Sequence, residues 1–334
     1  MKRISYFCNK VKRMTMKRSI LIIMLCIIAT AGNAQLPLEL SRMNRQKAFK
    51  KAVPAGNYSG ITRFAGNHYA LVSDKADQMG FYLFTIDIDS ISGKLRRVAC
   101  EDFISTGMKS DDEEAIAYVP QSQTLWLTSE ATTTVRECDQ QGRLTGRQLP
   151  TQQVYGLLDG DQGLEALTYD SISRQFWTCQ EGAPVSIRSF SADLTPQGCY
   201  AYCLDEPTAK RKPLHYAHGV SELLALADGT LLVMEREFFV PKKKIGSFVV
   251  NKIYRVAPHG DTAFDDDGTL KKQLVAKWKT RLNLTRRSLA NYEGMCLGPR
   301  LTDGRQVIIL VSDSQNQYGG ILKDYFKTIV ITAL

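Results

Sequence analysis

A pattern of two short apolar runs, the second closed by an acidic residue, recurs along the chain at intervals of about 50 to 70 residues. Turn residues such as Asp228-Gly229 separate the two runs, and the pattern predicts two antiparallel strands joined by a tight turn. The first positions of the five copies are Ser59, Glu114, Glu165, Glu222 and Glu293, and the last positions are Asp74, Glu130, Glu181, Glu235 and Asp313. Such a period indicates a repeat architecture in which each copy is one structural unit.

Each copy continues into a third stretch that alternates or is apolar, and four copies continue into a fourth. The third stretches are 81–88, 133–138, 185–190, 252–256 and 328–332, and the fourth are 96–103, 146–149, 198–204 and 273–280. Alternation of this kind is typical of strands with one face in a core. Four strands in a meander, repeated radially, form a β-propeller. The sequence therefore predicts an all-β fold, a β-propeller with five blades.

The two ends of the chain are expected to close the ring. The fifth copy reaches Leu334 before its fourth strand, and segment 41–53 precedes the first copy and is available to supply that strand. Six blades is the alternative, because the long interval between Glu222 and Glu293 has room for a degenerate unit. We expect one propeller domain over residues 57–334, preceded by an N-terminal segment, 35–56, that contains the ring-closing strand.

Residues 1–34 differ in kind from the repeats. Lys17 and Arg18 precede an apolar run from Ile20 to Ile28, and small residues follow before Gln35. The run is shorter than the about 20 residues that a membrane-spanning helix needs. The segment predicts a signal peptide, and thus an exported protein, periplasmic or extracellular, without a stable membrane span after cleavage. A retained anchor is the alternative.

Removing this segment changes the interpretation of the charge. The whole chain has a formal net charge of +9, but residues 1–34 hold seven of its 43 basic residues and none of its 34 acidic ones. The mature chain is therefore nearly neutral, which argues against nucleic-acid binding. Basic runs remain at Lys210-Arg-Lys212 and Lys242-Lys-Lys244, where we expect solvated loop charge rather than a docking patch.

In a propeller, equivalent positions of successive blades converge on the central axis. The repeated acids should therefore meet, and like charges so close together need cations, protons or hydrogen bonds. Oxygen-rich clusters favour Ca²⁺ or Mg²⁺. The predicted metal ligands are Asp74, Glu130, Glu181, Glu235 and Asp313, with Ca²⁺ as the expected ion. For Glu114, Glu165, Glu222 and Glu293 a second role is equally open, in which they hydrogen-bond backbone amides of a neighbouring blade.

Three further residues are candidates for catalysis. Lys75 and Arg236 follow closing acids of the first and fourth copies, where they would grip a phosphate group. His218 lies in a repeat loop, as do His68 and His215, and is the histidine we assign to the site. The serines form no GxSxG elbow, so the sequence does not support an α/β-hydrolase nucleophile.

Several of these segments resemble one family. Segment 219–236, Ile253-Tyr-Arg-Val256 and Asn291-Tyr-Glu-Gly-Met295 with Val311-Ser-Asp313 are similar to signature segments of the phytase-like family, also described as having esterase-like activity of phytase. Ser59-Gly-Ile61 and Gly163-Leu-Glu-Ala-Leu167 fit it too, and the resemblance covers roughly residues 55 to 334. It implies an exported bacterial β-propeller and suggests calcium-assisted hydrolysis of phosphate or other esters.

Two classes of function follow. The first is a metal-dependent ester hydrolase, expected to be a monomer, with a small-molecule phosphomonoester or other ester as substrate. The second is a non-catalytic propeller of the cell envelope that binds a ligand, glycan or protein, with the acids serving the ring. A lactonase-like propeller, which also uses a central calcium, is a third possibility.

Overall fold

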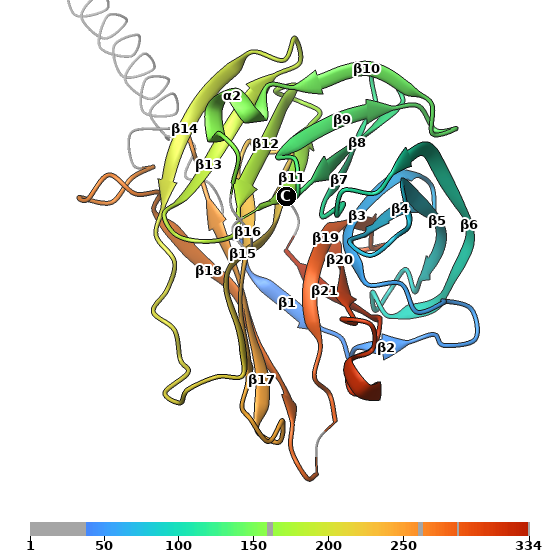
Figure 1. Ribbon diagram of the computed structural model, residues 1–334, viewed down its shortest axis with the longest axis vertical. Coiled ribbons are helices and arrows are strands. Elements are labelled where there is room, and N and C mark those ends of the chain that lie inside the picture. The colour runs from blue at the N-terminus through green and yellow to red at the C-terminus, as the bar shows by residue number, and fades with distance from the viewer. Residues whose placement is uncertain (1–37, 159–162, 260–262, 286, 333–334) are drawn as a thin grey trace, which may run out of the picture. The chain divides into compact units, whose positions relative to one another are not determined.

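The computed structural model describes residues 38–158, 163–259, 263–285 and 287–332 (Figure 1). The predicted signal peptide, residues 1–34, lies outside the described residues. No helix in the described ranges is long and apolar enough to cross a membrane.

The described chain is a five-bladed β-propeller, built from four four-stranded antiparallel sheets and a fifth sheet of five strands (Figure 1). The first blade consists of β3 (Tyr58–Ala65), β4 (His68–Ser73), β5 (Gln78–Ile88) and β6 (Leu95–Lys109), and the second of β7 (Ile116–Val119), β8 (Thr124–Ser129), β9 (Thr134–Cys138) and β10 (Leu144–Leu149). The third consists of β11 (Leu164–Asp170), β12 (Gln175–Gln180), β13 (Val185–Ser191) and β14 (Pro196–Tyr202), and the fourth of β15 (His215–Ala225), β16 (Leu231–Val240), β17 (Ser247–Val256) and β18 (Lys272–Leu282). The fifth contains β19 (Asn291–Arg300), β20 (Gln306–Asp313) and β21 (Tyr325–Ile331). A short helix, α2 (Thr151–Tyr155), and a 3₁₀ turn, η2 (Tyr318–Gly320), lie in connecting loops.

The N-terminal segment closes the ring, as predicted. Strand β1 (Leu40–Met43) pairs antiparallel with β21, with Leu40 opposite Ile331, and β2 (Lys47–Ala48) pairs with the same strand. The six-blade alternative is wrong. The interval between Glu222 and Glu293 is filled by the 10- and 11-residue strands of the fourth blade and their connections.

A buried hydrophobic cluster lies between each pair of neighbouring blades. Strand β20 shows how the blades share these clusters. Val307, Ile309 and Val311 pack toward the first blade, whereas Ile308 and Leu310 pack toward the fourth. Because both faces of such a strand are buried, it appears in the sequence as an unbroken apolar run.

The fourth blade is longer than its neighbours. Its strands have 10 or 11 residues, compared with 4 to 6 in the second blade. At about 3.3 Å per residue, the extra length extends this sheet by roughly 15 Å. The outer limit of this extension is the pair of His215, the first residue of β15, and Val240, the last residue of β16.

Candidate functional site

A cavity of about 800 Å³ opens at one end of the central channel, where the innermost strands begin. Six carboxylates line it: Asp74, Glu114, Glu130, Glu165, Glu181 and Glu293. The cationic side chains in its lining are Lys75 and Arg236, and the histidines are His215 and His218. The structure thus brings together most of the residues that the sequence proposed for one site.

The strand registers sort these residues into two rings. Bulges in the innermost strands of the third, fourth and fifth blades set apart Glu165, Ser221 and Glu293. The equivalent positions of the first two blades are Ser59 and Glu114, and these five residues form the inner ring. The outer ring follows the second strand of each blade and consists of Asp74, Glu130, Glu181, Arg236 and Asp313. The repeat predicted the outer ring correctly in four blades.

The fourth blade corrects the predicted alignment by one residue. Glu235 pairs with Val220 in the register that Gln180 and Leu164 hold in the third blade, so Arg236, not Glu235, is the equivalent of Glu181. Likewise Ser221, not Glu222, is the equivalent of Glu165. A shift of one residue in a strand moves a side chain to the opposite face. The segment Ser221-Glu222-Leu223 follows the Ser59-Gly60-Ile61 pattern of the first blade, which was the signal for the correct register.

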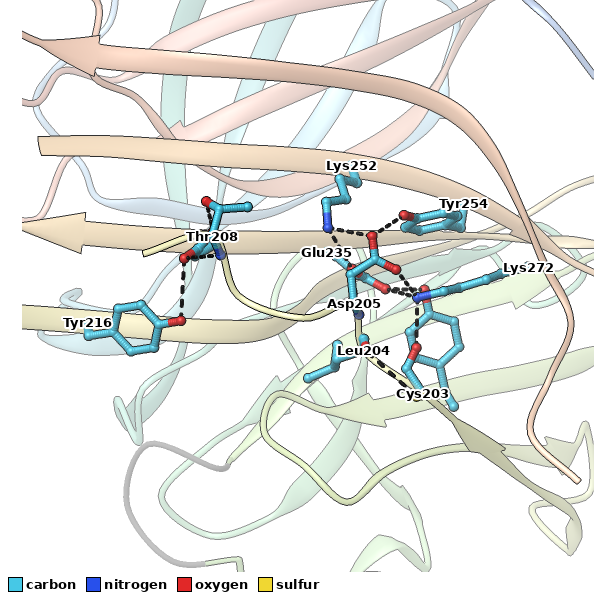
Figure 2. Close-up of polar contacts among 11 residues, drawn as sticks. Cys203, Leu204, Asp205, Thr208, Tyr216, Glu235, Lys252, Tyr254 and Lys272 are labelled. Atoms are coloured by element: carbon cyan, nitrogen blue, oxygen red, sulfur yellow. Dashed lines mark hydrogen bonds and ion pairs between the residues drawn. The ribbon is translucent and has the colours of Figure 1, made fainter. Parts of the chain in front are cut away.

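Glu235 therefore faces away from the cavity and belongs to a separate polar network (Figure 2). Tyr202 donates a hydrogen bond of 2.8 Å to Glu235, and the Lys272 ammonium lies 2.8 Å from the same oxygen. Lys252 and Lys272 also form ion pairs with Asp205, which attaches the segment after β14 to the fourth blade. Tyr202 and the two lysines thus provide the Glu235 carboxylate with a hydrogen bond and with positive charge, so that its burial needs no metal ion.

Glu222 holds neighbouring blades together. Its carboxylate is buried and accepts a 2.9 Å hydrogen bond from the Leu223 backbone. Burial raises the pKa of Glu222 well above its usual range, and hydrogen bonds from the backbone of Leu223, Leu167 and Met295 oppose that shift. Leu167 and Met295 lie on the innermost strands of the third and fifth blades. Glu222 therefore has the second of the two roles considered for it, in which it hydrogen-bonds backbone amides of neighbouring blades.

Replacing Glu222 should therefore affect stability and not activity. In Glu222→Ala, the backbone amides that the carboxylate serves lose their acceptor inside the protein, so we expect the free energy of unfolding to fall by about 3 kcal/mol. Urea denaturation measures this loss. Glu206→Ala, at an exposed acid, is the matched control and should change stability by less than about 0.5 kcal/mol. Equal stability of the two variants would contradict the assignment.

Glycines in the next blade make room for two of the outer-ring acids. A Cβ atom at Gly163 would lie 1.9 Å from Glu130 Cγ, and one at Gly219 would lie 2.5 Å from Glu181 Cγ. Only a residue without a side chain allows such a close approach. The glycines thus position Glu130 and Glu181 against the wall of the cavity.

Burial and mutual repulsion make the acids of the cavity resist ionisation. Burial, with the charges of neighbouring carboxylates, raises the pKa of Glu114, Glu165 and Glu293 well above the usual range. The same causes raise the pKa of Glu130 to about 7, and burial together with Asp74 raises that of Asp313 to about 7. A site with this excess of negative charge favours a bound cation.

Arg236 is the buried cation of the outer ring. Its Nη2 lies 2.6 Å from Glu181 Oε1, and its Nη1 forms a second ion pair with Glu293. Both side chains and the guanidinium are buried. Arg236 therefore neutralises and orients two acids from different blades. These contacts engage Nη1 and Nη2, the atoms with which it was predicted to grip phosphate, and leave Nε without a partner among the described residues.

Lys75 is the more accessible cation. Its side chain is 52% exposed, and its ammonium lies 2.9 Å from Asp74 and 3.8 Å from Asp112. Partial burial opposes its charge, but the hydrogen bond and the attraction of Asp74 outweigh that effect and raise the pKa of Lys75 to about 12. Lys75 is therefore a charged group at the cavity rim.

The structure separates the three histidines of the repeat loops and adds residues that the sequence did not single out. His215 and His218 line the cavity from β15, whereas His68 begins β4 and lies against Phe64. Asn291, Tyr216 and Phe238 also line the cavity. Asn291 precedes Glu293 by two residues and donates a 2.8 Å hydrogen bond to it. Residues two apart in a strand point to the same face, so the position of Asn291 relative to Glu293 could have identified it from the sequence.

The donors of the cavity match a hard cation in chemistry. They are carboxylate and amide oxygens, which Ca²⁺ prefers. Two buried oxygens, Asp74 Oδ1 and Asn291 Oδ1, have no hydrogen-bond partner within the described part of the chain. As the side chains lie, no three Asp, Glu, His or Cys groups of the described residues converge on one metal position. The residues thus fit Ca²⁺ by charge and donor type, and binding requires the carboxylates to move together.

Comparisons with known proteins identify the family of the chain. No curated protein sequence matches the chain. A luciferin-regenerating enzyme is similar in structure with a TM-score of 0.46 at 8% identity, over 87% of this chain and 97% of that one. Hydrazine synthase of Kuenenia stuttgartiensis is similar with a TM-score of 0.40 at 10% identity, over 84% of this chain and 88% of that one. Residues 53–315 match the family described as "Phytase-like: Esterase-like activity of phytase", and the chain belongs to this phytase-like family.

Proposed function

We propose that the protein is a calcium-dependent ester hydrolase that acts on phosphomonoesters at the mouth of the central channel. One observation carries this proposal: six carboxylates and the cationic side chains of Lys75 and Arg236 line one cavity, and the buried Asp313 adds to the negative charge near Glu114. An anionic substrate cannot enter such a cavity unless a cation offsets the acids. The family to which the chain belongs, with its esterase-like description, supports a hydrolytic reaction.

The outer ring is the proposed metal site. Asp74, Glu130, Glu181 and Asp313 would supply carboxylate oxygens, and Asn291 an amide oxygen. Bound Ca²⁺ would offset the charge of these acids, polarise the ester and favour deprotonation of water. Glu235 is not included, because it faces the separate network with Lys252 and Lys272.

Residues of the cavity would then carry out proton transfer and hold the phosphate group. Glu130, through a carboxylate oxygen that is not bound to the metal, is the candidate acceptor of a proton from the attacking water. The water oxygen bonds to phosphorus as the bond to the alcohol oxygen breaks, and His218, which also lines the cavity, is the candidate donor of a proton to that alcohol. Lys75 would contact the phosphate oxygens, and Arg236 would position Glu181 and Glu293.

Activity measurements on residues 35–334 test the proposal. We expect turnover of p-nitrophenyl phosphate with Ca²⁺ and its loss with a chelator. Glu130→Gln should lower kcat by about 10²- to 10⁴-fold, because the proton acceptor is gone. Glu235→Gln is the matched control, since it removes a carboxylate outside the cavity, and it should retain kcat.

The same measurements separate the alternatives. Turnover of p-nitrophenyl butyrate or of a lactone, without phosphatase activity, would keep the hydrolase and reject the phosphomonoester. Calcium binding with no turnover of any of these substrates would favour a non-catalytic propeller. Unchanged activity of Glu130→Gln would remove Glu130 from the mechanism.

A further inference from the structure

Three loops meet at the extended end of the fourth blade. The loop before β15 is joined to the end of β16 by a 2.6 Å hydrogen bond from Leu214 N to Val240 O. The β16–β17 turn is joined to the end of β18 by a 2.8 Å hydrogen bond from Gly246 N to Leu282 O. The loop after β18 follows directly (Figure 1). We call these three loops the blade-four tip.

Each loop of the blade-four tip combines basic residues with one exposed aliphatic side chain. Leu214 is 50% exposed and follows Lys210-Arg-Lys212, and Ile245 is 55% exposed and follows Lys242-Lys-Lys244. Leu284 is 85% exposed and lies between Arg281 and Arg287. This repeated combination in three segments distant in sequence is the observation that carries the inference.

Most basic side chains of the blade-four tip are exposed and are not neutralised by acidic residues of the described chain. Lys210, Arg211, Lys212, Lys242, Lys243, Arg281 and Arg287 are exposed, and none of them forms an ion pair with another described residue. Asp205 in the first loop is bound to Lys252 and Lys272, which leaves Glu206 as an exposed acid there. The tip therefore carries a strong positive charge, although residues 35–334 taken as a whole are nearly neutral.

The tip is held rigidly on the propeller. A small buried cluster of Val249, Leu289 and Leu322 ties it to the fifth blade, with Tyr318 packed against it. Lys244 lies 4.3 Å from the centre of the Tyr318 ring, and His215 contacts the same ring. Ile245 and Leu284 thus project from an end of the fourth blade that is packed against the fifth, and Leu214 lies where the tip meets the cavity.

We propose that the blade-four tip docks the protein onto a bilayer that contains anionic phospholipid. Lys and Arg side chains are attracted to anionic headgroups, and aliphatic side chains beside them enter the boundary between headgroups and acyl chains. Nucleic acid is a poorer fit, since single strands are held by aromatic stacking and the exposed tip residues are aliphatic. The first loop leads into His215 and His218 on the cavity wall, so docking holds the mouth of the channel beside the lipid headgroups. This inference does not depend on the proposed catalysis.

Vesicle flotation of residues 35–334 tests the docking. The protein should bind vesicles of phosphatidylcholine and phosphatidylglycerol in about a 2:1 ratio, and not vesicles of phosphatidylcholine alone. Raising the salt from about 0.1 M to about 1 M should release it, because the screening length falls from about 10 Å to about 3 Å. Lys242→Glu with Lys243→Glu should weaken binding at least about 25-fold, at about fivefold per charge. Ile245→Ser with Leu284→Ser should weaken it at least about tenfold.

Matched controls lie on the first blade. Lys94→Glu with Arg97→Glu reverses two exposed charges on the β5–β6 hairpin, and Ile91→Ser removes a side chain that is 70% exposed in the same hairpin. These variants should bind vesicles like the unchanged protein. Docking is overturned by equal binding to both vesicle types, by no binding to either, or by tip variants that behave like the controls. Binding to single-stranded DNA and not to vesicles would assign the tip to another polyanion and also overturn it.

Discussion

Replacing Arg236 by methionine should lower the free energy of unfolding by about 3 to 5 kcal/mol at neutral pH, because it leaves buried carboxylates without their cation. Arg236 bridges Glu181 and Glu293, which come from the third and fifth blades. The expected loss should shrink toward pH 5, since the pKa of Glu293 is already raised by burial and its proton removes the uncompensated charge. Chemical denaturation at several pH values measures both effects.

Lys75→Met is the matched control for this experiment. It also removes a cation beside an outer-ring acid, but its side chain is 52% exposed, so the loss should be under about 1 kcal/mol. Combining Arg236→Met with Glu181→Gln and Glu293→Gln should restore part of the stability, since no buried charge is then unpaired. An Arg236→Met protein as stable as the control would show that the ring does not need its cation.

Calcium should stabilise the protein strongly and more so as the pH rises. The folded protein holds protons on Asp313 and Glu130 up to a pKa of about 7, above the ordinary carboxyl range. Their contribution to stability is therefore complete below about pH 4 and is lost as the pH rises through 7. Bound Ca²⁺ needs the ionised acids, so its stabilisation replaces the lost contribution. At 100 times its Kd, Ca²⁺ should add about 2.7 kcal/mol.

Thermal unfolding with Ca²⁺ or chelator measures this linkage. We expect a small rise of Tm with Ca²⁺ at pH 5 and a large one at pH 8. Sodium at equal ionic strength is the control for general screening. A calcium effect that is independent of pH, or one that sodium reproduces, would mean that the cavity acids do not bind the ion.

The repeat predicted the fold because every blade needs the same buried strands and the same tight turns between them. Strands such as β20 must bury both faces, and the turns between strands need residues such as Asp303-Gly304. Ring closure was also predictable, since the fifth copy lacks a fourth strand and β1 fills that place. The rule against open sheet edges makes the two ends pair.

The site was less predictable, since its residues depend on register. In the fourth blade, Glu222 and Glu235 resemble the acids of the other blades in sequence, yet the bulge at Ser221 assigns the ring positions to Ser221 and Arg236. A difference of one residue changes an acid into the cation of the ring. The contacts of Arg236 with Glu181 and Glu293 join three blades, which no pattern within one repeat encodes.

Direct calcium binding by titration calorimetry tests the central claim, that the outer ring at the channel mouth is the metal site. We expect saturable binding by the unchanged protein and by Glu235→Gln, whose altered group lies outside the cavity. Asp74→Asn with Asp313→Asn, which removes two outer-ring carboxylates, should weaken binding at least about 100-fold. Equal calcium binding by this double variant and the unchanged protein would contradict the account.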